Sequence, residues 1–164
     1  MGNAMNRNNT LGKQLAKLLD WEDAHIGFDT AVANIPTRAR SKQPAGLPYS
    51  PWQILEHLRL TQKDILDFCL NPNYKGLKWP DDYWPLSQTP SSSEKWHKSI
   101  LQFQQDRKTF KKMAADPKRD LTSLIPHGNG QTYLREIILA ADHSAYHIGQ
   151  LVAVRRLLGV WQSP

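Results

Sequence analysis

The sequence predicts an all-α protein, a four-helix bundle with an up-down-down-up order and a long crossover between its second and third helices. Four segments carry apolar residues at intervals of three and four, and proline or glycine punctuates them. No window keeps the alternation of a half-buried strand. Because 164 residues suffice for one core, we expect a single domain over residues 1–164, with 1–9 as a flexible N-terminal tail.

The first two helices are predicted from their apolar period and from residues that cap or stop them. The first runs from Leu11 to about Asn34, and Pro36 follows as a stop. The second begins in "SPWQ", where Ser50 can cap, a proline takes the first helical position and Gln53 completes a capping box. It should continue to about Leu70, before an Asn-Pro pair.

The remaining two helices follow long connections. The stretch "NPNYKGLKWPDDYWPLSQTP" is far longer than a link between antiparallel neighbours requires, so it can cross the bundle and leave the second and third helices parallel. The third helix is predicted from about Ser92 to Ala115, and the fourth from a cap at Thr132 to about Leu158. Aromatic residues should pack the crossover onto the bundle: Tyr74, Trp79, Tyr83 and Trp84.

Composition restricts the class of protein. The 21 Lys and Arg residues against 15 Asp and Glu residues leave a net charge of +6, but they are scattered, which argues against nucleic-acid binding. The single cysteine, Cys69, excludes an intramolecular disulfide and favours the cytoplasm. No apolar run approaches the roughly 18 to 20 residues of a membrane span. Two alternatives stay open at the start: Met1 to Ala4 are native, or the natural chain starts at Met5.

Three histidines form the main candidate site. His143 and His147 in "ADHSAYHIGQ" lie on one helix face with Cβ atoms roughly 6 Å apart, a spacing that can hold a metal but also occurs in simple packing. His57 lies on a polar stripe of the second helix. Three neutral imidazoles from two helices would suit zinc or nickel and leave coordination positions open for water or substrate.

Four polar residues are candidates for lining a pocket beside these histidines: Gln53, Thr61, Asp64 and Gln150. Asp64 shares the face of His57 but lies roughly 10 Å along the helix, so it is better placed to orient a substrate than to bind the metal. Gln150 either lines the cavity or satisfies a backbone group. We assign no catalytic residue, and we interpret His25 and His97 as structural or exposed. His127 is interpreted as an exposed turn histidine, with the alternative that its loop folds back to reach the pocket.

The fourth helix carries apolar residues on two opposite faces. One face holds Leu134, Ile138, Ala141, Ala145, Ile148 and Val152, and the other holds Ala140, His143, His147, Val154 and Leu158. One face can fill the interior of the bundle, and the other then needs cover from the crossover or from a second subunit. We therefore expect a homodimer.

The motifs "SPWQILEHL" and "DHSAYHIGQLVAVRRLLG", together with the long crossover, resemble the DinB-like (DinB/YfiT-like) superfamily of metalloenzymes over nearly the whole chain. The resemblance implies a four-helix bundle, often dimeric, with a divalent metal on three histidines. It maps these ligands to His57, His143 and His147.

Family members include thiol-dependent transferases and isomerases, which use bacillithiol or mycothiol, and some hydrolases. We therefore expect a metal-dependent thiol transferase or hydrolase acting on a small molecule, with zinc or nickel and a low-molecular-weight thiol as cosubstrate. A divalent metal would lower the pKa of a bound water or thiol, which is where both chemistries begin. The alternative is a non-catalytic metal-binding or dimerising helical module.

Overall fold

The protein is helical, as the sequence predicts. A computed structural model describes residues 2–20 and 22–162, with side chains for 10–20 and 22–162, and no strand occurs in these ranges. The elements are α1 (Gly2–Leu18), α2 (Phe28–Val32), the 3-10 helix η1 (Thr37–Ala39), α3 (Pro51–Leu70), α4 (Ser93–Ala115) and α5 (Tyr133–Leu157). None of the described helices is both long and apolar enough to cross a membrane.

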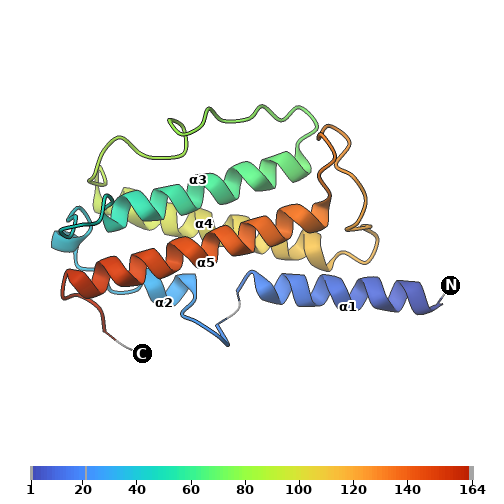
Figure 1. Ribbon diagram of the computed structural model, residues 1–164, viewed down its shortest axis with the longest axis horizontal. Helices are drawn as coiled ribbons and strands as arrows, with labels where there is room; N and C mark the ends of the chain where they lie inside the picture. The colour runs from blue at the N-terminus through green and yellow to red at the C-terminus, as the bar shows by residue number, and fades with distance from the viewer. Residues whose placement is uncertain (1, 21, 163–164) are drawn as a thin grey trace.

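Helices α3 and α4 start at the same end of the molecule, as Figure 1 shows. The connection between them, residues 71–92, returns along the outside of α3 before α4 begins. Helix α5 runs in the opposite direction and packs against α3, while α1 packs mainly on α4. At Gly12 a Cβ atom would stand 2.3 Å from the carbonyl oxygen of Ala114, so glycine permits this close approach of α1 to α4.

The prediction of one helix from Leu11 to Asn34 is wrong, because the structure divides this segment into α1 and α2. Breaking the helix lets Phe28 of α2 stack on Phe103 of α4, with ring centroids 3.9 Å apart. Asn34, with φ of 56°, ends the segment. The apolar period continues across the break, so it cannot reveal a change in helix direction.

Two further features of this segment were not predicted from the sequence. Helix α1 begins at Gly2, so the backbone of residues 2–9 is helical where a flexible tail was expected. At the other end, Arg155 of α5 donates to the carbonyl oxygens of Thr30 and Ala31, at 3.3 and 2.6 Å. These two acceptors lie in α2, whose last carbonyls would otherwise lack partners.

The predicted boundaries of the other helices are confirmed within one or two residues. Ser50 and Gln53 form the capping box at the start of α3, Ser92 caps α4, and Thr132 caps α5. The hydroxyl of Ser50 also donates to the carbonyl oxygen of Gln88, at 2.8 Å, which fastens the end of the crossover to α3. Local sequence therefore sets these helix ends correctly.

Replacing Ser50 with alanine should destabilise the protein by about 1 to 2 kcal/mol, because α3 loses its cap and the crossover loses a hydrogen bond. The matched control is Ser92→Ala, which removes the cap of α4 and leaves the hydrogen bond between Ser50 and Gln88 in place. Urea unfolding of both variants measures the difference. Equal losses would show that the Ser50 contact with Gln88 contributes nothing.

The interior contains two groups of buried apolar residues. One joins α2, α3, α4 and the C-terminal half of α5, and includes Phe28, Trp52, Leu55, Trp96, Phe103 and Leu151. The other joins the opposite ends of α3 and α4 to the start of α5, and includes Ile65, Phe110, Ile125 and Ile137. Since both groups share the same three long helices, α3, α4 and α5 are rigid supports for any side chain placed between them.

Part of the α5 face that holds Ile138, Ile148 and Val152 is covered within the chain. Ile148 and Val152 pack in the same buried group as Phe28 and Val32 of α2. The cover that we expected from the crossover or from a second subunit is thus supplied there by α2, a helix that the sequence pattern had merged into the first one. Toward the start of α5, Ile138 remains 47% exposed.

Candidate metal centre

Helices α3 and α5 bring three histidines together in the interior. The donor atoms of His57, His143 and His147 all lie within 4.8 Å of one another. The Nε2 atom of His57 is 3.0 Å from Nε2 of His143 and 3.1 Å from Nε2 of His147. Nitrogen ligands at about 2.0 to 2.1 Å from one zinc ion are separated by roughly 2.9 to 3.4 Å, depending on the coordination geometry.

The outer nitrogens of two of these rings are held by acceptors. His57 Nδ1 donates to the backbone oxygen of Tyr83 at 2.8 Å, and His147 Nδ1 donates to Gln150 Oε1 at 2.8 Å. A neutral imidazole has one N–H, so both rings present an unprotonated Nε2 toward the centre of the cluster. Outer-shell contacts of this kind orient histidine ligands and select their tautomer.

This arrangement fits a cation. With both protons on Nδ1, the contact between His57 Nε2 and His147 Nε2 brings two lone pairs to 3.1 Å, without a proton between them. Such a contact is repulsive between neutral rings, whereas a positive ion between the two nitrogens makes each lone pair a ligand. The donor set, three neutral imidazoles, is one that zinc and nickel accept.

Burial keeps these rings neutral. It lowers the pKa of His57 to about 4, with a smaller contribution in the same direction from His147, while the hydrogen bond to Tyr83 acts the other way. Burial, together with the two neighbouring imidazoles, lowers the pKa of His143 to about 3. The pKa of His147 is also lowered, chiefly by burial. The lone pairs are therefore available near neutral pH.

Aromatic rings from two loops cover the cluster. Trp84 of the crossover stacks on His57 at 3.7 Å with the ring planes 5° apart, and Tyr49 stacks on the far side of Trp84 at 3.8 Å. His57 is 1% exposed and His147 is 7% exposed, while His143 is intermediate. A small molecule can therefore reach the Nε2 atoms at the centre of the cluster most easily from the side of His143.

The four candidate pocket residues have different contacts in the structure, and one of them is hydrogen-bonded to a histidine of the cluster. Gln150 contacts His147 directly. Thr61 is buried one turn beyond His57, and its hydroxyl has no hydrogen-bond partner. Gln53 is occupied by the capping box, and its amide nitrogen also lies 3.5 Å from the carbonyl oxygen of Pro85. Both oxygens of Asp64 accept from tyrosine hydroxyls of the crossover.

Sequence reasoning assigned Tyr83 and Trp84 to packing of the crossover and missed their contacts with His57. The aromatic run "DYWP" was the available signal, but no local pattern indicates which helix residue it contacts. Trp79 of the same connection is 68% exposed, so it does not pack onto the bundle as expected. His127, from the loop before α5, lies 2.7 Å from the carbonyl oxygen of Phe68, and His97 is exposed.

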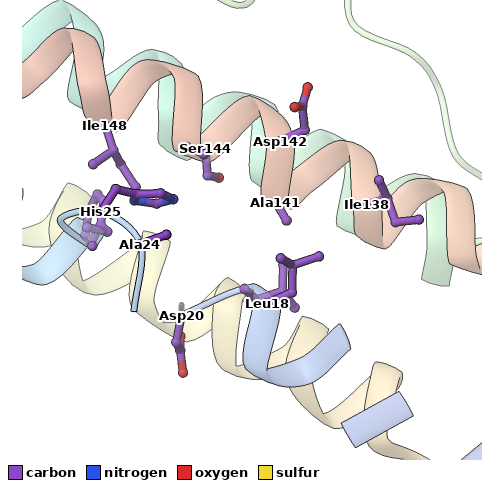
Figure 2. Close-up of a pocket in the computed structure, with 13 residues that line it drawn as sticks. Leu18, Asp20, Ala24, His25, Ile138, Ala141, Asp142, Ser144 and Ile148 are labelled. Atoms are coloured by element: carbon purple, nitrogen blue, oxygen red, sulfur yellow. The ribbon is translucent and has the colours of Figure 1, made fainter. Parts of the chain in front are cut away.

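A cavity of about 420 Å³ lies on the other face of α5, between this helix and the segment that joins α1 to α2. Figure 2 shows Ala141 pointing across it toward Leu18, with His25 and Ile148 at one end. His57, His143 and His147 are not among its lining residues. The cavity is thus separate from the candidate metal centre.

The helices and the buried cluster define an all-helical protein with three convergent histidines in its interior. A family model described as the DinB superfamily matches residues 21–151, and the chain belongs to that superfamily. Neither the comparison with curated proteins nor that with solved structures gave a match. Family membership and the histidine cluster are both compatible with a metal site.

Proposed function

We propose that the protein is a metal-dependent enzyme in which His57, His143 and His147 bind one divalent ion, zinc or nickel. The observation that carries the proposal is the pair of Nε2 atoms of His57 and His147, 3.1 Å apart with their protons on the outer nitrogens. Tyr83 and Gln150 would keep both rings in the ligand tautomer, and Trp84 would exclude water from one side.

The proposed reaction is thiol transfer or hydrolysis on a small molecule, with a low-molecular-weight thiol as cosubstrate in the first case. A divalent ion bound there would supply Lewis-acid chemistry, lowering the pKa of a water or thiol. Three protein ligands leave positions for such a group, and the partly exposed side of His143 would admit it. The unpaired hydroxyl of Thr61, one turn beyond His57, and the side chain of Gln150, which contacts His147, are the candidates for contacting a substrate.

The proposal includes an overall architecture and an assembly. We propose that α1, α3, α4 and α5 form one up-down-down-up bundle domain over residues 1–164, with residues 71–92 as its crossover, which is supported by the helix directions in Figure 1. A homodimer is supported by apolar side chains exposed along α5, namely Ile138, Tyr146 and Leu157. A cytoplasmic location and the absence of nucleic-acid binding remain predictions from the sequence.

Protein purified without an affinity tag should retain about one zinc or nickel ion per chain, because three preorganised neutral imidazoles form a strong site. Elemental analysis measures the metal, and a screen of thiol adducts and esters measures turnover. Metal with no turnover on any compound would favour the non-catalytic module. Metal-free protein after gentle purification would contradict the site itself. Sedimentation of the same preparation, with an expected mass of two chains, checks the homodimer.

A further inference from the structure

Tyr83 is in contact with both the histidine cluster and a carboxylate two helical turns away. Its backbone oxygen accepts from His57 Nδ1 at 2.8 Å, and its hydroxyl donates to Asp64 Oδ2 at 2.6 Å. His57 and Asp64 lie seven residues apart on α3, hence on one face and roughly 10 Å apart along its axis. One residue of the crossover therefore bridges two fixed points of the same helix.

The carboxylate of Asp64 is fully used by the crossover. Tyr74 donates to Oδ1 at 2.8 Å, and Tyr83 occupies Oδ2. Burial, with the neighbouring Asp64 carboxylate, raises the pKa of both phenols, so they stay protonated and remain donors. Hydrogen bonds to a charged acceptor are stronger than those between neutral groups. Asp64 is thus a strong attachment point for an otherwise irregular connection.

The rest of the crossover is attached at its far end. Ser50 binds the carbonyl oxygen of Gln88, and Trp84 lies flat between Tyr49 and His57. Between these attachments and Asp64, the connection has no regular secondary structure. The Tyr83 N–H donates to the carbonyl oxygen of Pro80 at 3.1 Å in a turn. The position of the Tyr83 carbonyl is therefore set by this turn, by the contacts of its neighbours and by its own side chain, and not by a helix or strand.

We propose that Asp64 is a positioning residue for the metal centre: through the Tyr83 hydroxyl it holds the Tyr83 carbonyl against His57 Nδ1, which keeps His57 Nε2 unprotonated and directed at the shared site. The inference rests on the proposed function, because it gives the carboxylate its purpose as support for a metal ligand. It also separates Asp64 from substrate binding, since both of its oxygens already have partners. Loss of the hydrogen bond between Asp64 and the Tyr83 hydroxyl would let the His57 ring exchange tautomers.

The test compares Asp64→Asn and Tyr83→Phe with a matched control, Tyr74→Phe, in the full-length protein. Tyr83→Phe removes one hydroxyl and keeps the ring and the backbone carbonyl. Tyr74→Phe removes the other hydroxyl on the same carboxylate, but His57 Nδ1 is bonded to Tyr83 and not to Tyr74. Zinc affinity, measured by competition with a chelating dye, should fall about 10- to 100-fold in the first two variants. In the control it should fall less than about threefold.

A second readout uses metal-free protein, so that it does not depend on the proposed function. Imidazole ¹⁵N NMR reports the tautomer of His57, which should carry its proton on Nδ1 in the wild type and in Tyr74→Phe. In Asp64→Asn and Tyr83→Phe the Nε2-protonated tautomer should appear. A tautomer change at His57 in these two variants but not in Tyr74→Phe separates loss of the Tyr83 contact from a general loss of structure.

The two proposals fail separately. If the wild-type protein binds no zinc, the proposed function is wrong, while the NMR comparison still decides whether Asp64 orients His57. If zinc binds and the affinities of Asp64→Asn and Tyr83→Phe stay within about twofold of the wild type, the positioning role is overturned and the metal site stands. An unchanged His57 tautomer in both variants overturns it as well, even where affinity falls.

Discussion

Replacement of His143 by alanine is expected to reduce metal retention from about one ion per chain to a small fraction, and to lower any turnover at least about a hundredfold. Changes in contacts outside the ligand shell already cost 10- to 100-fold in affinity, so loss of a ligand should cost more. His143 is also the partly exposed member of the cluster, which makes it the residue beside which a substrate would approach. Elemental analysis and steady-state kinetics measure both effects.

The matched control is His97→Ala, which removes an exposed histidine of α4 that lies outside the cluster. This variant should keep the metal content and activity of the wild type. Circular dichroism of both variants verifies that the fold is retained. Full metal occupancy in His143→Ala would rule out the ligand assignment, and equal losses in both variants would point to an indirect effect.

Replacement of Phe103 by alanine should cost about 3 to 5 kcal/mol of unfolding free energy, a large part of the stability of a domain of this size. Phe103 is 1% exposed and stacks on Phe28, with the planes 21° apart. Removing the ring leaves a cavity where α2 meets α4, and it takes away the contact that accompanies the break between α1 and α2. Guanidinium unfolding gives the free energy directly.

Leu101→Ala serves as the comparison on the same helix, because Leu101 is 64% exposed. Its unfolding free energy should change by no more than about 0.5 kcal/mol. A loss below about 1 kcal/mol in Phe103→Ala would mean that the surrounding side chains collapse into the space, and that α2 is not anchored by this stack.

The cluster of three histidines was accessible to prediction because part of its spacing is local. His143 and His147 are four residues apart on one helix, so the helical period alone places both rings on the same side. His57 was identified by the polar stripe that it shares with Thr61 and Asp64. That α3 lies beside α5, with these stripes facing each other, follows from the apolar residues on both helices packing into one core.

The residues that hold the histidines in place were harder to predict than the histidines themselves. Tyr83 and Trp84 lie 26 and 27 residues after His57, in a connection without periodicity, so no sequence rule pairs them with that ring. Asp64 was assigned to substrate orientation because it shares the face of His57 but lies roughly 10 Å along the helix, too far to bind the same metal. The structure instead gives each of its oxygens a phenol from the crossover, a pairing that depends on the path of the whole loop.

The sequence by itself determined the helical class, the ends of α3, α4 and α5, and the three histidines, since caps and helical periods are properties of neighbouring residues. Only the tertiary structure decided that the first predicted helix is broken so that Phe28 meets Phe103, and that α2 covers part of the α5 face that holds Ile148 and Val152. It also decided how the crossover lies over His57. These features depend on contacts between residues distant in the chain, which form when they bury more apolar surface or satisfy more polar groups than the locally preferred arrangement.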